Sequence, residues 1–576
     1  MTYRRPIAVA DCESDPFKFG RVPTPFIWGF WDDGFLDPDV PYREFSTARE
    51  MVAFLRDKEY IVYVHNGGKF DYHYMLDYIE PFDEIMIING RLAKFHIGIC
   101  EFRDSYNIIP VPLAQYQKTA IDYAIFEPGE RDKPKNREEI RSYLRDDCRF
   151  LYEIVSKFVD RFGLQMTQAG ASMRQWQKIS GLKPPKASAE YHGEFQPYYY
   201  GGRCECFKVG LINKPFRAVD INSAYPRAMV EKHPYFLDYT TEDGDPGLSR
   251  EEMGPAFYTV NAVSRGAFPY RDRDGSLWFP RDNEPREYHI TGWELLAALD
   301  TGTVEDVDIL ECRYFSKLVS FADYVYQFYN ERKLAVREGD KANSLFGKLF
   351  MNSLYGKYAM NPDEFFEYLI VSREMVGYLD VESIDAFRHN GVEYENVPYQ
   401  FAGELGPHVL ARAPLADEKK RYYNIATAAS VTGFVRAHLW RAAQQCSGLI
   451  YMDTDCITAH HIGDLEEGPE LGQWTTEGEF TRGAVAGKKL YAFRYKPGTG
   501  PTDKKTDKPK TWKLAHKGVK LNARQILKVA RGGKVTYKPE VPTYSVYQPP
   551  RFVTRDVKAT GKTADTKSRE AKLREY

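Results

Sequence analysis

The segment Gly448–Thr458 most constrains the fold, because an apolar strand runs into two acidic residues and out again. Asp453 and Asp455 stand where such a strand is expected to turn. Carboxylates beside a core are costly to desolvate unless a cation compensates them. Hard divalent cations prefer oxygen ligands of this kind. The segment therefore predicts a Mg²⁺ site on a strand hairpin, with a simple Asx turn as the alternative.

The length of 576 residues, 43% of them hydrophobic, predicts several domains. The apolar run Ile7–Ala10 is too short for a signal peptide, and no stretch approaches the roughly eighteen apolar residues of a spanning helix. We therefore expect a soluble protein inside a cell, without a membrane partner. The eight cysteines contain no CxxC pair, so we assign neither a disulfide nor zinc.

The net charge of −2 conceals an uneven distribution along the chain. Residues 501–576 carry 20 Lys and Arg against 7 Asp and Glu, a net charge of +13, which leaves −15 for residues 1–500. A basic segment on an acidic body favours contact with a polyanion, nucleic acid first. We expect residues 513–538 to be folded, whereas residues from about 550 onward lack apolar periodicity and predict a solvated tail.

Two segments near the N-terminus predict buried strands that lead into acidic residues. Ile7–Glu13 has a period of two that places Asp11 and Glu13 on one face. Ile61–Asn66 is a second apolar strand, followed by Asp71 and a helical pattern.

A further acid is expected on a helix. Tyr143 and Asp147 lie four residues apart at the predicted start of a helix whose apolar stripe continues to Phe158. In phosphodiester hydrolysis by two metal ions about 4 Å apart, carboxylates of this kind serve as the metal ligands. The four acids together predict a nuclease site, although each alone is more often a cap or a surface charge.

Six short motifs follow one another along the chain. They are Asp11-x-Glu13, Asn66-x₃-Phe70-Asp71, Tyr143-x₃-Asp147, Asp220-x₂-Ser223-x-Tyr225, Lys348-x₃-Asn352-x₂-Tyr355 and Tyr451-x-Asp453-x-Asp455. In this order they resemble the three exonuclease motifs and polymerase motifs A, B and C of family B DNA polymerases with 3′–5′ proofreading. The resemblance implies a multidomain α/β fold: a ribonuclease H-like exonuclease domain and a right-hand polymerase domain of palm, fingers and thumb.

Three further motifs narrow the resemblance. They are Tyr199-x-Gly201-Gly202, Lys489-x-Tyr491 and Lys118-x₂-Ile121. They are similar to motifs of the protein-primed subgroup that replicates linear phage genomes, in podophages and tectiviruses. This resemblance implies a monomeric, strand-displacing enzyme in the cytoplasm of an infected cell, primed by a separate terminal protein.

Other functions remain open at this stage. One alternative is a family B polymerase that extends ordinary primers, and another is an exonuclease whose polymerase half only clamps DNA. A sugar-nucleotide transferase also uses Asp-x-Asp pairs, but it leaves the exonuclease acids and the basic end unexplained.

We expect two insertions in the polymerase half, the first from the spacing of the motifs and the second from an alternating pattern around Glu367–Val371 that predicts strands near residues 361–415. The 128 positions from Asp220 to Lys348 exceed what a palm strand and two finger helices need. In the resembling family, the first insertion contacts the priming protein and the template duplex, and the second encircles DNA for processivity and strand displacement. The expected segments are 1–175 exonuclease, 176–235 first palm part, 236–316 insertion 1, 317–360 fingers, 361–415 insertion 2, 416–500 second palm part, 501–550 thumb and 551–576 basic tail.

Roles for polymerase residues follow from the resemblance and from chemical need. Two Mg²⁺ ions, or Mn²⁺ as a substitute, are expected on Asp220 and Asp455, with Asp453 in support. Lys348, Asn352 and Tyr355 fall on one helical face that should line the dNTP pocket. The remaining expected contacts are Tyr225 as steric gate, Lys341 as a second triphosphate contact, Tyr199 with Gly201 and Gly202 on the template, and Lys489 and Tyr491 on the primer terminus.

Roles for exonuclease residues follow in the same way. Two further Mg²⁺ ions are expected on Asp11, Glu13, Asp71 and Asp147. Tyr143 should orient the attacking water and Lys118 should stabilise the phosphate. Asn66, Phe70 and Ser105, with the adjacent Tyr106, are expected to bind the single-stranded primer end.

Overall fold

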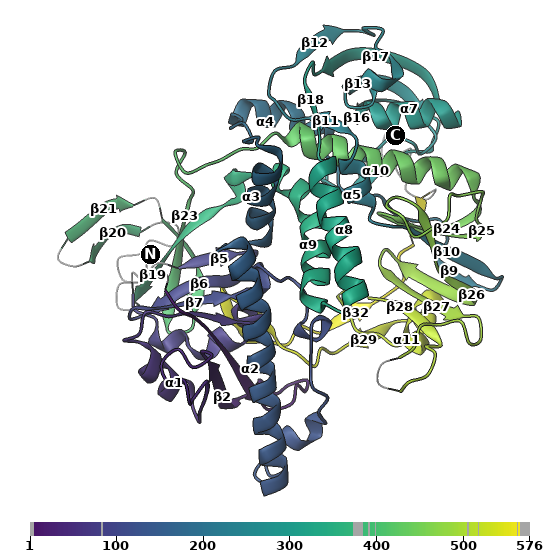
Figure 1. Cartoon of the computed structure of the whole chain (residues 1–576). Coiled ribbons are helices and arrows are strands. Elements are labelled where there is room, and N and C mark those ends of the chain that lie inside the picture. The colour runs from purple at the N-terminus through teal and green to yellow at the C-terminus, as the bar shows by residue number, and fades with distance from the viewer. Residues whose placement is uncertain are drawn as a thin grey trace.

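The computed structural model describes residues 5–81, 85–372, 384–389, 392–397, 399–503, 506–516, 518–561 and 563–564. Figure 1 shows an N-terminal sheet and a second large sheet on opposite sides of a central group of helices. Among the described residues, no helix combines the length and apolar character needed to cross a membrane.

The N-terminal sheet has seven strands in the order β3-β2-β1-β4-β7-β6-β5. Strand β4 pairs in parallel with both β1 and β7, and the other pairs are antiparallel. The strands are β1 (Ile7–Ser14), β2 (Pro25–Trp31), β3 (Tyr42–Phe45), β4 (Ile61–Val64), β5 (Met86–Ile88), β6 (Arg91–Ile97) and β7 (Cys100–Asp104), with helix α1 (Ala48–Leu55) between β3 and β4. Both predicted strands, β1 and β4, are present.

The helical pattern predicted after β4 is instead three short 3₁₀ turns, η1 (Gly67–Lys69), η2 (Asp71–Tyr74) and η3 (Leu76–Tyr78). Phe70 separates the first two turns because its backbone, with φ −151° and ψ −79°, is not helical. Gly68 is pressed against β6, where an added Cβ would lie 2.3 Å from the Leu92 carbonyl oxygen. The chain is therefore packed too closely here for a regular helix.

Helix α2 (Pro134–Phe162) packs across β1 and β2. Tyr143 and Asp147 lie in its middle and not at its start, because Pro134 occupies the first turn and begins the helix nine residues before Tyr143. The next helix, α3 (Gln168–Ser180), packs on the two helices of the segment expected as fingers, 317–360. The expected end of the exonuclease domain at residue 175 therefore falls inside α3.

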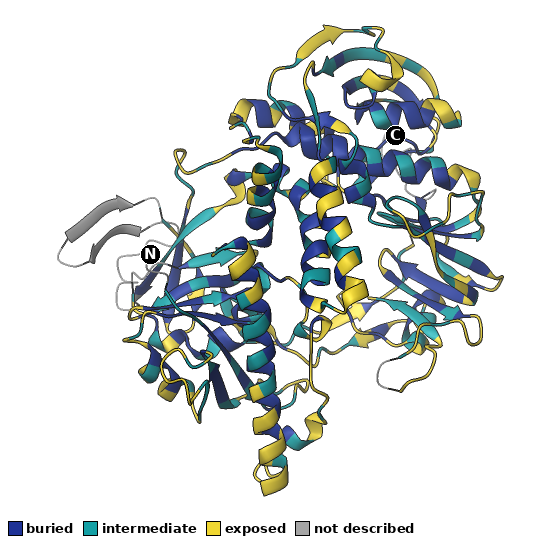
Figure 2. Ribbon diagram, viewed as in Figure 1, coloured by how far each residue is buried: buried dark blue, intermediate teal, exposed yellow. Residues whose placement is uncertain are grey.

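The second sheet has eight strands, in the order β28-β27-β26-β10-β25-β24-β8, with β9 paired to β26. Its strands are β8 (Cys204–Cys206), β9 (Gly210–Ile212), β10 (Phe216–Ile221), β24 (Ser447–Asp453), β25 (Cys456–His461), β26 (Trp474–Gly487), β27 (Leu490–Tyr495) and β28 (Trp512–Ala515). Because β28 joins this sheet, the sheet that holds the expected palm segments extends past residue 500 into the segment expected as thumb. Helix α10 (Ile425–Gln445) contacts β25 of this sheet and packs on α5 (Ala224–Met229), which follows β10. Helix α10 is buried along most of its length (Figure 2).

The segment expected as insertion 1 contains a four-stranded sheet in the order β12-β17-β13-β16. Its helix α7 (Gly292–Thr301) packs on α10. The other elements of this segment are β12 (Thr240–Asp243), α6 (Arg250–Met253), β13 (Phe257–Ser264), β14 (Tyr270–Arg271), β15 (Leu277–Trp278), β16 (Pro285–Thr291) and β17 (Val304–Tyr314). Outside its bounds lie α4 (Ala189–Phe195), β11 (Lys232–Pro234) and β18 (Leu318–Ser320).

The expected fingers are two antiparallel helices, α8 (Ala322–Glu338) and α9 (Lys341–Tyr358). Gly339, with a φ of 74°, ends α8, and the Asp340 side chain caps α9. The chain thus reverses within two residues, so the two helices pack along their length.

The segment expected as insertion 2 forms strands, as its alternating pattern predicted. They are β19 (Phe366–Ser372), β20 (Ile384–His389), β21 (Val392–Val397), β22 (Gln400–Leu405) and β23 (His408–Pro414). Ile370, Leu405 and Leu410 share an apolar cluster with the N-terminal sheet. Residues 373–383, 390–391 and 398 of this segment lie outside the described residues.

The stretch 513–538 is folded, as expected. It contains α11 (Ala523–Ala530) and β29 (Val535–Tyr537), which are followed by β30 (Thr543–Ser545), β31 (Gln548–Arg551) and β32 (Arg555–Val557). The prediction of a solvated tail from residue 550 is wrong for the described part, because β32 pairs with β29 and Val557 and Ala564 are buried. A three-residue strand is too short to show periodicity. Residues 562 and 565–576 lie outside the described part of the chain.

Candidate active sites

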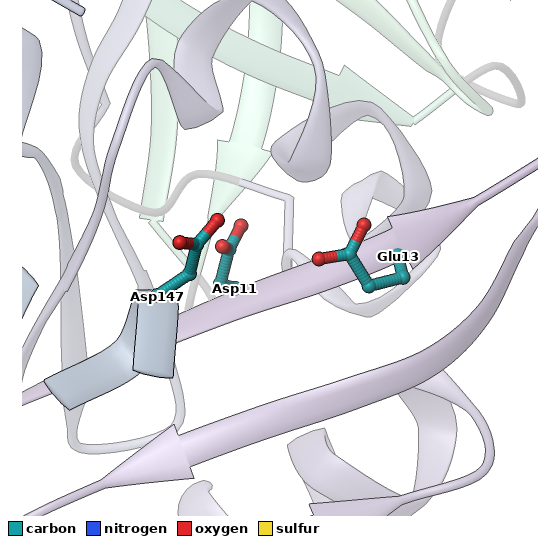
Figure 3. A group of neighbouring side chains, drawn as sticks. All are labelled: Asp11, Glu13 and Asp147. Atoms are coloured by element: carbon teal, nitrogen blue, oxygen red, sulfur yellow. The ribbon is translucent and has the colours of Figure 1, made fainter. Parts of the chain in front are cut away.

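Three predicted carboxylates come together between β1 and α2 (Figure 3). Asp11 and Glu13 project from β1 and Asp147 from α2, with one oxygen of each within 4.8 Å of the others. The alternation of side chains along β1 places both of its acids on one face, and α2 crosses β1. We call Asp11, Glu13 and Asp147 the N-terminal acid cluster.

Lys118 and Tyr143 lie beside this cluster, as expected. The Lys118 Nζ is 3.3 Å from Asp147 Oδ2 and 5.2 Å from the centre of the Tyr143 ring. The hydroxyl groups of Tyr143 and Tyr123 are 2.9 Å apart. Tyr123, on the 3₁₀ turn η6 (Tyr123–Phe126), was not found from the sequence because no motif includes it.

The cluster is electrostatically costly without a cation. Burial raises the pKa of Asp11 well above its usual value, and the charges of Asp71 and Asp147 raise it further. Burial and then Asp11 raise the pKa of Glu13, and burial also raises the pKa of Asp147, against the opposing charge of Lys118. Among the described residues, Asp147 Oδ1 is buried without a hydrogen-bond partner. Such a donor set fits a hard divalent cation.

The fourth predicted acid, Asp71, lies outside the N-terminal acid cluster. Its Oδ1 accepts a hydrogen bond from the thiol of Cys12 over 3.0 Å, and burial raises its pKa to about 6. The structure therefore brings three of the four predicted carboxylates together. Asp71 influences the cluster through its charge.

Of the residues expected to bind single-stranded DNA, Ser105 differs from the others in being fully buried. Asn66, in a left-handed conformation (φ 63°), accepts from the Arg91 guanidinium over 2.5 Å, and Phe70 makes an edge contact with Tyr544. Ser105 is fully buried and its hydroxyl donates to the Val64 carbonyl, so it does not reach a DNA strand. The expectation for Ser105 is therefore corrected. The adjacent Tyr106 is half-buried and has Arg91 over its ring.

The acidic segment of the second sheet is a hairpin with a two-residue turn. Asp453 at the end of β24 pairs with Cys456 at the start of β25, so Thr454 (φ 59°) and Asp455 form the turn. Asp220 on β10 pairs with the same Cys456, and the Ile221 N–H donates to the Asp455 carbonyl over 2.9 Å. The sheet thus gathers all three predicted acids at one edge.

These acids also fit a cation. Burial and then Asp455 raise the pKa of Asp220 to about 7, and burial with Asp453 raises that of Asp455 to about 6. Among the described residues, Asp220 Oδ1 is buried without a hydrogen-bond partner. Glu477 on β26, paired with Lys513 on β28, adds a further carboxylate whose charge acts on Asp220 and Asp455. Sequence reasoning missed Glu477 because it stands in an ordinary alternating strand.

The loop Tyr199–Gly202 is packed against the turn of the acidic hairpin. A Cβ added at Gly202 would lie 2.7 Å from Thr454 Oγ1, and the Thr454 N–H donates to the Arg203 carbonyl over 2.6 Å. Tyr199 is half-buried and Gly201 is exposed. The approach requires glycine at position 202.

Two buried residues that no motif marked hold the same loop. The Arg436 guanidinium on α10 donates to the carbonyls of Tyr200 and Gly201 over 2.5 and 3.0 Å. The Glu294 carboxylate on α7 accepts from Arg436 Nε over 2.7 Å. The loop is therefore tied to the expected insertion 1.

Lys489 and Tyr491 lie next to the hairpin. The Lys489 N–H donates to the Tyr451 hydroxyl over 2.9 Å, and its Nζ is 3.5 Å from Asp453 Oδ1. The Tyr491 ring stacks on Phe493, with centroids 4.2 Å apart. Both predicted residues thus adjoin the acids.

Helix α9 presents the predicted nucleotide face. Lys348 and Asn352 are exposed, and the half-buried Tyr355 stacks on Tyr225 of α5. Lys357, nine residues after Lys348 and therefore on the opposite side of α9, is half-buried with its Nζ 5.6 Å from the centre of the Tyr423 ring, and burial lowers its pKa.

A second triphosphate contact from this region remains a prediction. Lys341, at the first position of α9, is exposed. Lys333, on the neighbouring helix α8, forms an ion pair of 2.9 Å with Glu470. The structure therefore leaves Lys341 as the less engaged of the two cations.

Comparison with known proteins relates the whole chain to DNA polymerases. A model of the family "DNA polymerase type B, organellar and viral" matches residues 112–398. The DNA-directed DNA polymerase of Enterobacteria phage PRD1 is 31% identical over 585 residues, covering 96% of this chain and 98% of the relative. The DNA polymerase of Bacillus phage Nf is 23% identical, covering 81% of this chain and 83% of the relative.

Solved structures show the same fold. Phi29 DNA polymerase complexed with primer-template DNA and incoming nucleotide substrates superposes with a TM-score of 0.69 at 17% identity, covering 97% of this chain and 100% of that one. Its binary complex with primer-template DNA gives 0.71 at 18%, covering 96% and 100%. The predicted fold class, a multidomain α/β polymerase with exonuclease, palm, fingers and thumb, is confirmed. The chain belongs to the organellar and viral type B DNA polymerases and is a DNA-directed DNA polymerase of the phage type.

Proposed function

We propose that the chain copies a DNA template from dNTPs at the acidic hairpin and removes mispaired primer ends at the N-terminal acid cluster. The observation that carries this proposal is the presence of two separate sets of mostly half-buried acids in one chain. Among the described residues, each set has one buried carboxylate oxygen without a hydrogen-bond partner. One set lies close enough to the stacked rings of Tyr225 and Tyr355 for the charge of Asp455 to act on both hydroxyls. The other set adjoins Lys118 and the buried Tyr143.

The proposed metal ligands at the polymerase site are Asp220 and Asp455, supported by Asp453. At the exonuclease site, they are Asp11, Glu13 and Asp147, with Asp71 in support. Two Mg²⁺ ions at each site, or Mn²⁺ in their place, would stabilise the charge that develops on the transferred phosphoryl group. The raised pKa values of Asp220 and Asp455 agree with acids arranged to receive cations.

Further residues are proposed to bind the substrates. Lys348 and Lys341 bind the triphosphate, Asn352 and Tyr355 face the nascent base pair, and Tyr225 excludes the ribose 2′-hydroxyl. Template contacts come from Tyr199, Gly201 and Gly202, and primer contacts from Lys489 and Tyr491. In the exonuclease, Tyr143 orients water, Lys118 stabilises the phosphate, and Asn66 and Phe70 hold the single strand.

Protein priming and strand displacement are the finer part of the proposal. They are supported by the resemblance of the Tyr199-x-Gly201-Gly202, Lys489-x-Tyr491 and Lys118-x₂-Ile121 motifs to the protein-primed subgroup. Insertion 1 (236–316) would contact a separate terminal protein, and insertion 2 (361–415) would surround DNA. We propose a monomer that acts in the cytoplasm of an infected cell, with the domain bounds stated above except that the palm sheet includes β28.

The test is extension of a 5′-labelled primer on a long single-stranded circle with Mg²⁺ and dNTPs. The intact enzyme should give full-length and displaced products. Asp455→Ala should lose extension but still shorten the primer, whereas Asp147→Ala should extend it without degradation. An intact enzyme that only shortens the primer would favour an exonuclease with a DNA-clamping polymerase half.

The mode of priming needs a second assay. A terminal protein encoded with the polymerase should become covalently labelled by α-³²P dNTP in the presence of the enzyme and template. Efficient extension of ordinary primers without any such labelling would favour a family B polymerase that uses conventional primers.

A further inference from the structure

The turn Gly487–Lys489, between β26 and β27, carries a residue in an unusual backbone conformation. Lys489 has a φ of 56°, which non-glycine residues rarely adopt, so its neighbours must hold it. On one side, its N–H donates to the hydroxyl of Tyr451, in the acidic hairpin. This bond places the lysine ammonium 3.5 Å from Asp453.

The other side of this turn is held by the C-terminal part of the chain. We call residues Val557–Gly561 the C-terminal strap. The Thr560 N–H donates to the Ala486 carbonyl over 2.8 Å, immediately before the turn. A Cβ placed on Gly487 would lie 3.4 Å from Thr560 Cγ2, so the Thr560 side chain packs beside this glycine at an ordinary van der Waals distance.

The strap is anchored in the folded body. Its first residue, Val557, belongs to an apolar cluster with Ala486 and Leu490 of the palm sheet and with α11. Immediately before it, β32 pairs with β29, and the Thr536 hydroxyl donates to Asp556 over 2.7 Å. Movement of the strap would therefore be transmitted to the palm sheet.

A cavity of about 280 Å³ lies behind the turn. Lys488 lines it from the turn and Leu490 from β27. Lys558 and Thr560 line it from the strap, and Trp278 from the expected insertion 1. Open space here means that side-chain packing does not fully fix the turn from this side. The hydrogen bond from Thr560 takes on that role.

We propose that the C-terminal strap is a positioning element that fixes Lys489 at the primer terminus and so sets how the primer end divides between the polymerase and exonuclease sites. The inference rests on the proposed primer contact of Lys489 and on the proposed proofreading activity. A looser turn would hold the primer end less firmly at the acidic hairpin, and the end would reach the N-terminal acid cluster more often.

The test compares Thr560→Pro, which removes the N–H donor, with Thr560→Ala, which keeps it. On a matched 5′-labelled template-primer, the dNTP concentration at which extension balances degradation should rise about fivefold in Thr560→Pro, the effect of losing one net hydrogen bond. It should not change in Thr560→Ala. Degradation of single-stranded DNA and extension at saturating dNTP should match the intact enzyme in both variants, which a general loss of structure would not allow.

Two further comparisons make the result decisive. A chain ended after Val557 should reproduce the shift, whereas a chain ended after Ala564 should not, and this pair replaces Thr560→Pro if that variant unfolds. Equal balance points for the matched variants would overturn the inference. So would a full shift in Lys558→Ala, because the segment would then act by direct phosphate contact.

A final variant distinguishes failure of the proposed role of the strap from failure of the proposed primer contact of Lys489. Lys489→Ala should shift the balance point at least as far as Thr560→Pro. No shift in Lys489→Ala would remove the proposed primer contact itself, whereas a shift in Lys489→Ala with none in the strap variants would overturn the strap alone.

Discussion

The rings of Tyr225 and Tyr355 stack face to face, with centroids 4.3 Å apart and 14° between their planes. Tyr225 comes from α5, next to the palm acids, and Tyr355 from α9 of the fingers. Burial raises the pKa of both hydroxyls, so both rings stay neutral at physiological pH. The stack therefore forms a rigid, uncharged wall that joins palm and fingers.

This wall predicts sugar discrimination by exclusion. Tyr225→Val removes the ring that we propose lies under the sugar, so ribonucleotides should be incorporated more readily. We expect the preference for dNTP over rNTP in kcat/KM to fall by about 100-fold. Single-nucleotide incorporation with each sugar measures the ratio, and Tyr355→Phe, which keeps the ring of the partner, serves as control. An unchanged ratio in Tyr225→Val would rule out this residue as the gate.

Gly202 provides a second prediction, because it is in contact with the turn that carries Asp455. In Gly202→Ala, the new Cβ would lie 2.7 Å from Thr454 Oγ1, so either the loop or the turn must shift. A displacement of about 1 Å at a catalytic centre can cost about 100-fold in rate. We expect primer extension to fall by that order while degradation of single-stranded DNA is unchanged.

The neighbouring glycine supplies the matched control. A Cβ at Gly201 would meet nothing within 4 Å, so Gly201→Ala keeps the proposed backbone contact with the template and should cost far less primer extension than Gly202→Ala. Thr454→Gly combined with Gly202→Ala should recover part of the lost activity, because it removes the clashing hydroxyl and methyl groups. Equal loss in both alanine variants would show that the close approach is not what matters.

Local patterns predicted the parts of the sites that depend on local geometry. The period of two in β1 placed Asp11 and Glu13 on one face, and the helical spacing of Lys348 and Asn352 placed both on one exposed face of α9. The strand–acid–strand pattern around Asp453 became a hairpin with a two-residue turn. In these cases, the decisive distances are set within one element.

Long-range partners could not be predicted in this way. Glu477 on β26 forms an ion pair with Lys513 on β28, and Arg436 on α10 forms one with Glu294 on α7. The sequence around each of these residues gives no sign of the distant residue with which it pairs. Asp71 shows the same limit, since its hydrogen bond to a buried thiol depends on how the turns after β4 pack against β1. Pairings of this kind are decided by the assembled fold.

Tyr143 allows a prediction for the exonuclease alone. Its hydroxyl lies among Asp147, Lys118 and Tyr123, where it can orient a water molecule toward the phosphate. Tyr143→Phe should lower the degradation rate of a single-stranded oligonucleotide by about 100-fold, a typical contribution of a positioned proton-transfer group. Tyr123→Phe breaks only the 2.9 Å contact and should cost far less. Degradation by Tyr143→Phe at the normal rate would refute the role, and primer extension should be normal in both.

The raised pKa values of the polymerase acids predict how stability depends on pH and metal. Folding raises the pKa of Asp220 to about 7, so the metal-free folded chain holds a proton that the unfolded chain releases near pH 4, and stability falls as pH rises between these values. With a chelator at pH 8, Asp220→Asn should therefore melt above the intact enzyme, by about 2 °C because the side chain is only half-buried. At pH 4, the two should melt together, and Mg²⁺ at pH 8 should stabilise the intact enzyme more than the variant. If Asp220→Asn melted above the intact enzyme by the same amount at both pH values, burial would not be disfavouring the ionised form of Asp220.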